Sequence, residues 1–121
     1  MIISDPSVLV PETPVIDVMR AITRAGAGAA CVVDPSNKFL GLITEGDLRR
    51  NFVNAEKPLE AKAAEIMTKG AFTIGPELLA VEGLEAFQNL PRSVGELPVL
   101  DADEKVLGLL MMKDLLRSGI V

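Results

Sequence analysis

The sequence predicts an α/β fold made of two copies of one β-α-β-β-α unit. The cluster "GLITEGDLRR" (41–50) recurs as "GLLMMKDLLR" (108–117), 67 residues later. The same offset relates Asp34 to Asp101, each of which closes an apolar run. Each copy also combines short apolar runs with amphipathic segments, the pattern of strands and helices. We therefore expect small sheets with helices packed on them, in units of residues 1–60 and 61–121.

The first strand and helix of each unit are predicted from apolar periodicity. "SVLV" (7–10) and "FTI" (72–74) are typical of short strands. In the helix expected over 15–24, apolar side chains recur every three or four residues. The second helix is expected over 77–89, and Pro14 and Pro76 stand at the two helix starts. "VIDVMRAI" (15–22) matches "AVEGLEAF" (80–87) at an offset of 65, so the second copy gains two residues before its next strand.

The second half of each unit is a strand pair followed by a helix. "AACVVD" (29–34) and "ELPVLD" (96–101) predict the first strand of each pair. "FLGLIT" (39–44) and "VLGLLM" (106–111) are apolar on both faces and predict buried strands. Short helices are expected to begin near residues 45 and 112. A half of about 60 residues buries little surface alone, so we expect the two halves to pack together.

The composition predicts an aliphatic core and argues against several classes of partner. Hydrophobic residues make up 49% of the 121 residues, with four Phe and no Trp or Tyr. The net charge of −5, with Arg49–Arg50 the one adjacent basic pair, argues against nucleic-acid binding. No apolar run is long enough to cross a membrane, and the N-terminus lacks the pattern of a signal peptide. We expect a cytoplasmic protein without a membrane partner.

The inventory of reactive side chains argues against catalysis and metal binding. The chain has no histidine, and its single cysteine, Cys31, lies in an apolar run where burial is expected. The usual general base and the commonest nitrogen ligand are therefore missing. Without a nucleophile–base pair we expect no enzyme activity, and without clustered ligands we expect no metal site.

Thr44 and Asp47 have two interpretations. A threonine followed three residues later by an acid resembles a capping box, which satisfies free N–H groups at a helix start. The same pair could instead contact a ligand. In the second copy Met111 replaces the threonine while Asp114 is kept, so the capping hydroxyl is lost there. Arg50 stands three residues after Asp47, as expected for a surface ion pair.

The doubled unit, closed in its first copy by the pattern G-x-x-T-x-x-D-L-x-R (41–50), resembles a pair of CBS domains, a Bateman module. The resemblance covers essentially the whole chain and implies two repeats related by pseudo-twofold symmetry. "AAEIMTKG" (63–70) and "DLLRSGIV" (114–121) look most like the CBS pair at the C-terminus of arabinose 5-phosphate isomerases, which combine a sugar-isomerase (SIS) domain with CBS domains. The isomerase domain itself is absent from this sequence.

The resemblance implies a ligand-binding cleft between the repeats. It assigns Thr44 to ribose or phosphate and Asp47 to the ribose hydroxyls, with Asp114 as the matching acid in the second copy. Arg49, which Leu116 replaces in the second copy, would add a cation for phosphate. The base would lie against apolar residues of the first copy: Val8, Val10, Ala30, Val32 and Ile43.

The resemblance also implies a regulatory function and its partners. The ligand would be AMP, ADP, ATP or a sugar nucleotide, with no required cofactor. The module would form a homodimer and modulate an attached sugar-phosphate isomerase. A ligand-free structural or oligomerisation module is the alternative, favoured by Met111. The isomerase-associated modules commonly carry histidines near this position, where Met111 and Lys113 stand here, so the two clefts are expected to differ.

Overall fold

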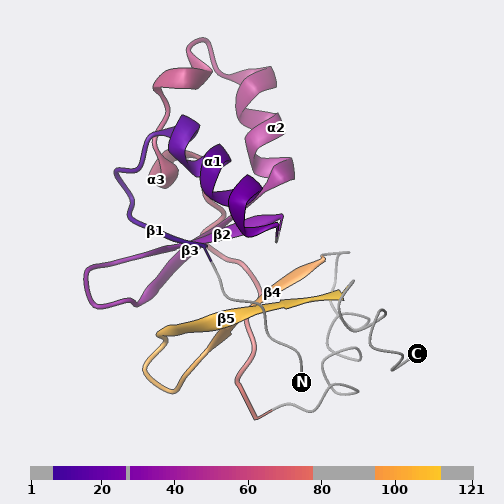
Figure 1. Cartoon of the computed structure of the whole chain (residues 1–121). Coiled ribbons are helices and arrows are strands. Elements are labelled where there is room, and N and C mark those ends of the chain that lie inside the picture. The colour runs from indigo at the N-terminus through magenta and orange to yellow at the C-terminus, as the bar shows by residue number, and fades with distance from the viewer. Residues whose placement is uncertain (1–6, 27, 78–94, 113–121) are drawn as a thin grey trace.

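The computed structural model describes residues 7–26, 28–77 and 95–112, which form a mixed α/β fold (Figure 1). The elements of the first unit are β1 (Ser7–Leu9), α1 (Val15–Ala25), β2 (Ala29–Val33), β3 (Phe39–Thr44) and α2 (Glu45–Asn54). A 3₁₀ turn, η1 (Pro58–Glu60), and a short helix, α3 (Ala63–Ile66), follow. The second unit contributes β4 (Glu96–Leu100) and β5 (Val106–Met111). No helix formed by these residues is long and apolar enough to cross a bilayer.

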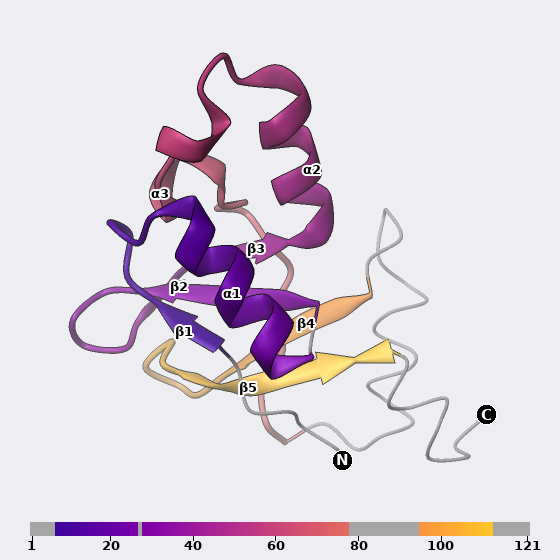
Figure 2. The same ribbon diagram turned by 45° about the horizontal axis from the view of Figure 1, so that its top comes forward.

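The first sheet has the strand order β1-β2-β3, with β1 parallel and β3 antiparallel to β2. Helix α1 lies across one face of this sheet (Figure 2). Its residues Val15, Val18 and Ile22 are buried in one core cluster with residues of β2 and β3. The predicted helical face is thus confirmed. The helix ends at Gly26, whose φ of 65° favours glycine and whose N–H bonds to the Ile22 carbonyl at 3.1 Å.

The opposite face of the first sheet packs on the β4–β5 hairpin. Ala29, Cys31 and Leu42 form a second buried cluster with Leu109 and Met111. Strand β2 is therefore buried along its whole length, with alternate side chains in the two clusters. Strand β3 also places Ile43 in the first cluster and Leu42 in the second, which confirms the prediction that it is covered on both faces. In β5 the prediction is met less fully, because Leu107 is 47% exposed. The packing of the hairpin on the first sheet also buries Met111 as a core residue.

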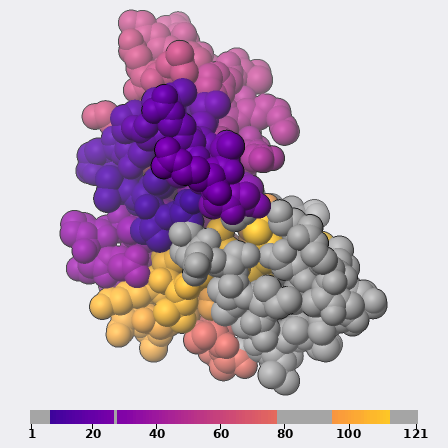
Figure 3. All heavy atoms as spheres, viewed as in Figure 1, coloured from indigo at the N-terminus to yellow at the C-terminus, as the bar shows by residue number. Residues whose placement is uncertain are grey.

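The turns of the two strand pairs are joined by crossed hydrogen bonds. The Phe39 N–H donates to the Glu104 carbonyl at 2.9 Å, and the Val106 N–H donates to the Asn37 carbonyl at 3.2 Å. Phe39 and Val106 are equivalent at the offset of 67, as are Asn37 and Glu104. The two bonds are thus related by a local twofold, and Figure 3 shows the two turns side by side at one edge of the molecule.

The second copy forms less of a strand at residues 72–74 than predicted. Ile74 makes one parallel bridge, to Val99, and Phe72 and Thr73 do not belong to a β-strand. The next ladder bond toward Phe72 would need an N–H from Pro98, which proline lacks. Most of the helix predicted over 77–89 and most of the one beginning near 112 lie outside the described residues. The unit boundary at residue 60 stays a prediction, and Ala61 and Ala63 pack in the first core cluster.

Burial of Cys31 predicts a specific dependence of stability on alkaline pH. Burial raises the pKa of this thiol from 9.0 to about 12. Between these values the unfolded chain loses a proton that the folded chain keeps, so the free energy of unfolding falls as pH rises. From pH 9 to 10 we expect wild type to lose about 1 kcal/mol more than Cys31→Ala. Urea unfolding of both proteins at each pH measures the difference; parallel pH profiles would contradict it.

Candidate functional site

The site is built on the first turn of α2. Thr44 is the N-cap, and its Oγ1 accepts a hydrogen bond from the Asp47 N–H at 3.3 Å. In return Asp47 Oδ2 accepts the Thr44 N–H at 2.9 Å and the Thr44 hydroxyl at 3.2 Å. The two residues therefore form the capping box that their spacing predicts. This local role exists whether or not they also contact a ligand.

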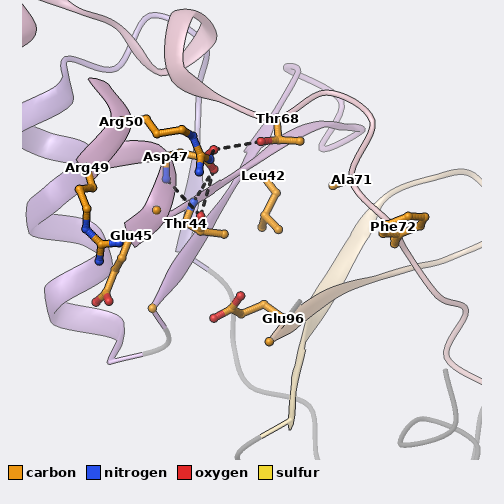
Figure 4. Close-up of a pocket in the computed structure, with 13 residues that line it drawn as sticks. Leu42, Thr44, Glu45, Asp47, Arg49, Arg50, Thr68, Ala71, Phe72 and Glu96 are labelled. Atoms are coloured by element: carbon orange, nitrogen blue, oxygen red, sulfur yellow. Dashed lines mark hydrogen bonds and ion pairs between the residues drawn. The ribbon is translucent and has the colours of Figure 1, made fainter. Parts of the chain in front are cut away.

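The second oxygen of Asp47 joins two further side chains. Asp47 Oδ1 accepts hydrogen bonds from Arg50 Nη2 and from Thr68 Oγ1, the latter at 3.0 Å. Figure 4 shows these groups converging on the carboxylate. Asp47 is only 6% exposed, whereas the Arg50 side chain is 66% exposed. The predicted ion pair between Asp47 and Arg50 is confirmed.

A cavity of about 460 Å³ opens beside this carboxylate. It lies between the first unit and the start of β4, with the segment after α3 along one side (Figure 4). Its lining residues are Gly28, Leu42, Thr44, Glu45, Gly46, Asp47, Arg49, Arg50, Thr68, Ala71, Phe72, Gly95 and Glu96. The volume falls in the range of small-molecule sites in proteins.

Gly28 and Gly95 are equivalent positions of the two copies, 67 residues apart, and both line this cavity. Each directly precedes the first strand of its unit's strand pair. Gly28 has φ of 73°, a conformation that side chains disfavour, so glycine is favoured there. The cavity thus lies where equivalent segments of the two repeats approach each other.

Charged side chains of both signs surround the cavity. Two guanidinium groups, Arg49 and Arg50, and three carboxylates, Glu45, Asp47 and Glu96, belong to the lining. The N-terminus of α2 faces the same space and carries a partial positive charge. Leu42, Ala71 and Phe72 supply apolar surface. Such a site can hold a ligand that has a polar, anionic end and a flat apolar part.

The structure brings together some of the predicted ligand-binding residues and not others. Thr44, Asp47 and Arg49 all line the cavity. Asp114 lies outside the described residues. The apolar residues expected against a base are absent from the cavity lining. Val8 and Val10 are 43% and 49% exposed, and the remaining three are buried on the α1 side of the sheet: Ala30, Val32 and Ile43.

Ala30, Val32 and Ile43 lie on the face of the first sheet that packs on α1. Successive side chains of a strand point to opposite faces, so Leu42 turns toward the cavity while Ile43 turns toward α1. Thr68 was not among the predicted site residues. Its signal is its place in "EIMTKG" (65–70), just before the strand predicted at 72–74. Among the described residues, no group of three or more Cys, Asp or Glu side chains is arranged to hold a metal ion.

Solved structures with CBS domains share this fold. "Crystal structure of CBS domain, NE2398" has a TM-score of 0.83 and 26% identity, covering 98% of this chain and 90% of the other. CBSX2 in complex with AMP has a TM-score of 0.80 and 20% identity, covering 98% and 93%. The CBS domain pair of MJ0100, in complex with 5′-methylthioadenosine and S-adenosyl-L-methionine, has a TM-score of 0.84 and 18% identity, covering 98% and 91%. The last two identities support the fold alone.

Curated relatives include arabinose 5-phosphate isomerases. The enzyme KdsD of Yersinia pestis is 36% identical over 111 residues, which are 92% of this chain and 33% of the relative. KdsD of Pseudomonas aeruginosa is 34% identical over 116 residues, 96% of this chain and 35% of the relative. The chain thus spans about a third of the length of these relatives. A CBS domain family model matches residues 1–54 and 63–120, so the chain belongs to the CBS domain family and carries a pair of these domains.

Proposed function

We propose that this chain is a regulatory module that binds an adenosine-type nucleotide or a sugar nucleotide and modulates an associated sugar-phosphate isomerase. The ligand occupies the cavity beside Asp47, and the module itself carries out no catalysis. The observation that carries the proposal is the buried Asp47 carboxylate, which lines a cavity at a helix N-terminus between the two repeats.

The lining supports a nucleotide in both chemistry and size. Thr44 and Asp47 offer polar groups for ribose hydroxyls, and Arg49 offers a cation for phosphate. The backbone N–H groups at the start of α2 favour an anion in the same space. Leu42 and Phe72 offer apolar surface for a base. The solved CBS structures with AMP and with 5′-methylthioadenosine give precedents for adenosine ligands in this fold.

The regulated partner is proposed from the curated relatives. This chain matches about a third of the isomerase KdsD, and the remaining two thirds have no counterpart in it. We propose that the module acts on a SIS isomerase domain, as a homodimer in the cytoplasm. Ligand binding would change the packing of the two repeats around the cavity. Coupling of this kind between two sites is typically about 1–3 kcal/mol.

Calorimetry against AMP, ADP, ATP and pyrimidine sugar nucleotides tests the binding. We expect saturable binding of at least one of them, and no heat from any at millimolar concentration would contradict the proposal. Gly46→Ala sharpens the test, because a Cβ there would make ordinary 3.5 Å contacts with Arg50 and Thr44 inside the cavity. We expect binding weaker by about fivefold or more, with a fold that is as stable or about 0.5 kcal/mol more stable.

Gly70→Ala serves as the matched control, because it has open space around its Cβ and does not line the cavity. Its ligand affinity should equal that of wild type. The alternative function is a structural module without a ligand, favoured by the capping box that Thr44 and Asp47 form. A module of that kind would show no ligand binding in wild type and would still control the oligomeric state of the full protein.

A further inference from the structure

The Asp47 carboxylate is fully engaged by the chain's own donors. Its two oxygens accept four hydrogen bonds, from the Thr44 N–H, the Thr44 hydroxyl, Thr68 and Arg50. An ionised carboxylate offers about four lone-pair positions. A ligand hydroxyl can therefore bind Asp47 only if one of these donors leaves.

The four donors differ in how easily they can leave. The Thr44 N–H bond is half of the capping box, so losing it opens the start of α2. The Thr44 hydroxyl is kept beside Asp47 because its oxygen accepts the Asp47 N–H. Thr68 is held in place by two backbone hydrogen bonds with Leu42, at 2.8 and 3.0 Å. The Arg50 guanidinium lies at the end of a long side chain that is 66% exposed. Ion pairs of such exposed groups are weak. Arg50 is thus the donor that a ligand displaces.

We propose that Arg50 exchanges partners: it pairs with Asp47 in the empty cavity and with the anionic group of the ligand in the filled one. Arg50 lines the cavity beside the α2 N-terminus, so its guanidinium remains close to any phosphate bound there. A neutral nucleoside displaces Arg50 from Asp47 but has no anionic group with which the guanidinium can pair. A nucleotide replaces the lost carboxylate with a phosphate. The exchange makes the cavity select phosphorylated over unphosphorylated nucleosides, and it rests on the proposed nucleotide binding.

Binding of AMP and adenosine to wild type and to Arg50→Ala tests the exchange, because the two ligands differ only in the phosphate. In Arg50→Ala we expect adenosine to bind up to about fivefold tighter, because its competitor for Asp47 is gone. AMP should bind about tenfold more weakly, because its cation is gone. Arg50→Lys should keep most of the preference for AMP. CMP and cytidine form the second pair if AMP does not bind.

Arg20→Ala is the matched control. Arg20 pairs with Asp17 at 3.4 Å with the same i, i+3 spacing on α1, and it does not line the cavity. Its affinity for each ligand should equal that of wild type. If Arg50→Ala changes both affinities in the same direction, or neither, the exchange is wrong while nucleotide binding stands. If wild type binds no nucleotide, the proposed function fails and the exchange fails with it.

Discussion

Replacing Asp47 with alanine is expected to lower the free energy of unfolding by about 2–4 kcal/mol. The substitution removes half of the α2 capping box, which is worth about 1 kcal/mol. It also leaves Thr68, and the N–H of Thr44, without their acceptor in a part-buried place. Loss of the Arg50 pair adds little because that side chain reaches solvent. Urea unfolding measures the change. The dependence of the free energy of unfolding on urea concentration should be the same for both proteins.

Asp17→Ala is the control for this prediction. Asp17 occupies the third position of α1, as Asp47 does in α2, and also pairs with an arginine three residues later. It is exposed, however, and its helix has no side-chain cap. We expect a loss of about 0.5 kcal/mol or less. Equal losses from the two substitutions would contradict a structural role for the buried carboxylate.

The second large effect is expected from Gly41→Ala, which should destabilise the fold by about 1–3 kcal/mol. A Cβ on Gly41 would lie 2.7 Å from Met67 Sδ, 2.8 Å from its Cγ and 3.1 Å from its Cβ. The clash reaches back to the base of the Met67 side chain, so a change of its outer torsions does not relieve it. The glycine thus permits the segment after α3 to pack directly on β3. Thermal and urea unfolding both report the loss.

A double-mutant cycle isolates the cause. Combining Gly41→Ala with Met67→Ala removes Sδ and Cγ, the two Met67 atoms within 3 Å of the added Cβ, and leaves only the Met67 Cβ contact at 3.1 Å. The double variant should therefore be more stable than the sum of the single losses predicts. Strictly additive losses would instead assign the effect to the backbone of β3. Gly70→Ala is the control, since nothing lies within 4 Å of the Cβ added there.

Much of the fold could be predicted because the repeat constrains it. The offset of 67 identifies equivalent residues, and it relates the Phe39–Glu104 hydrogen bond to the Val106–Asn37 hydrogen bond. Helix α1 was predicted from its periodicity to within one residue at its C-terminal end. The strand at 72–74 was overestimated because its own residues are suitable but its partner contains Pro98. The sequence pattern of one strand does not show that its partner strand lacks an N–H donor.

The site was predicted where chemistry is local and was not predicted where it depends on packing. Thr44 and Asp47 lie three residues apart, so their capping geometry follows from the sequence. Thr68 is 21 residues from Asp47 and joins it only through the tertiary fold. The apolar lining depends on which face of β3 is turned to α1, and a run such as "FLGLIT" (39–44) is apolar on both faces. The alternation of side chains along β3 therefore does not show which of its two faces turns toward α1.

The proline in β4 has a consequence for the behaviour of the protein at high concentration. Pro98 stands where the first copy has Cys31, and Cys31 lies in a central strand paired on both sides. Among residues 7–26, 28–77 and 95–112, strand β4 pairs with β5 on one side and meets Ile74 in a single bridge on the other. The central residues of β4 are buried in the folded chain, so this edge can recruit a strand from another molecule and start aggregation only while the chain folds. Pro98 is the central residue of β4, and proline has no N–H to donate. It therefore disfavours the pairing of β4 with a strand from another molecule.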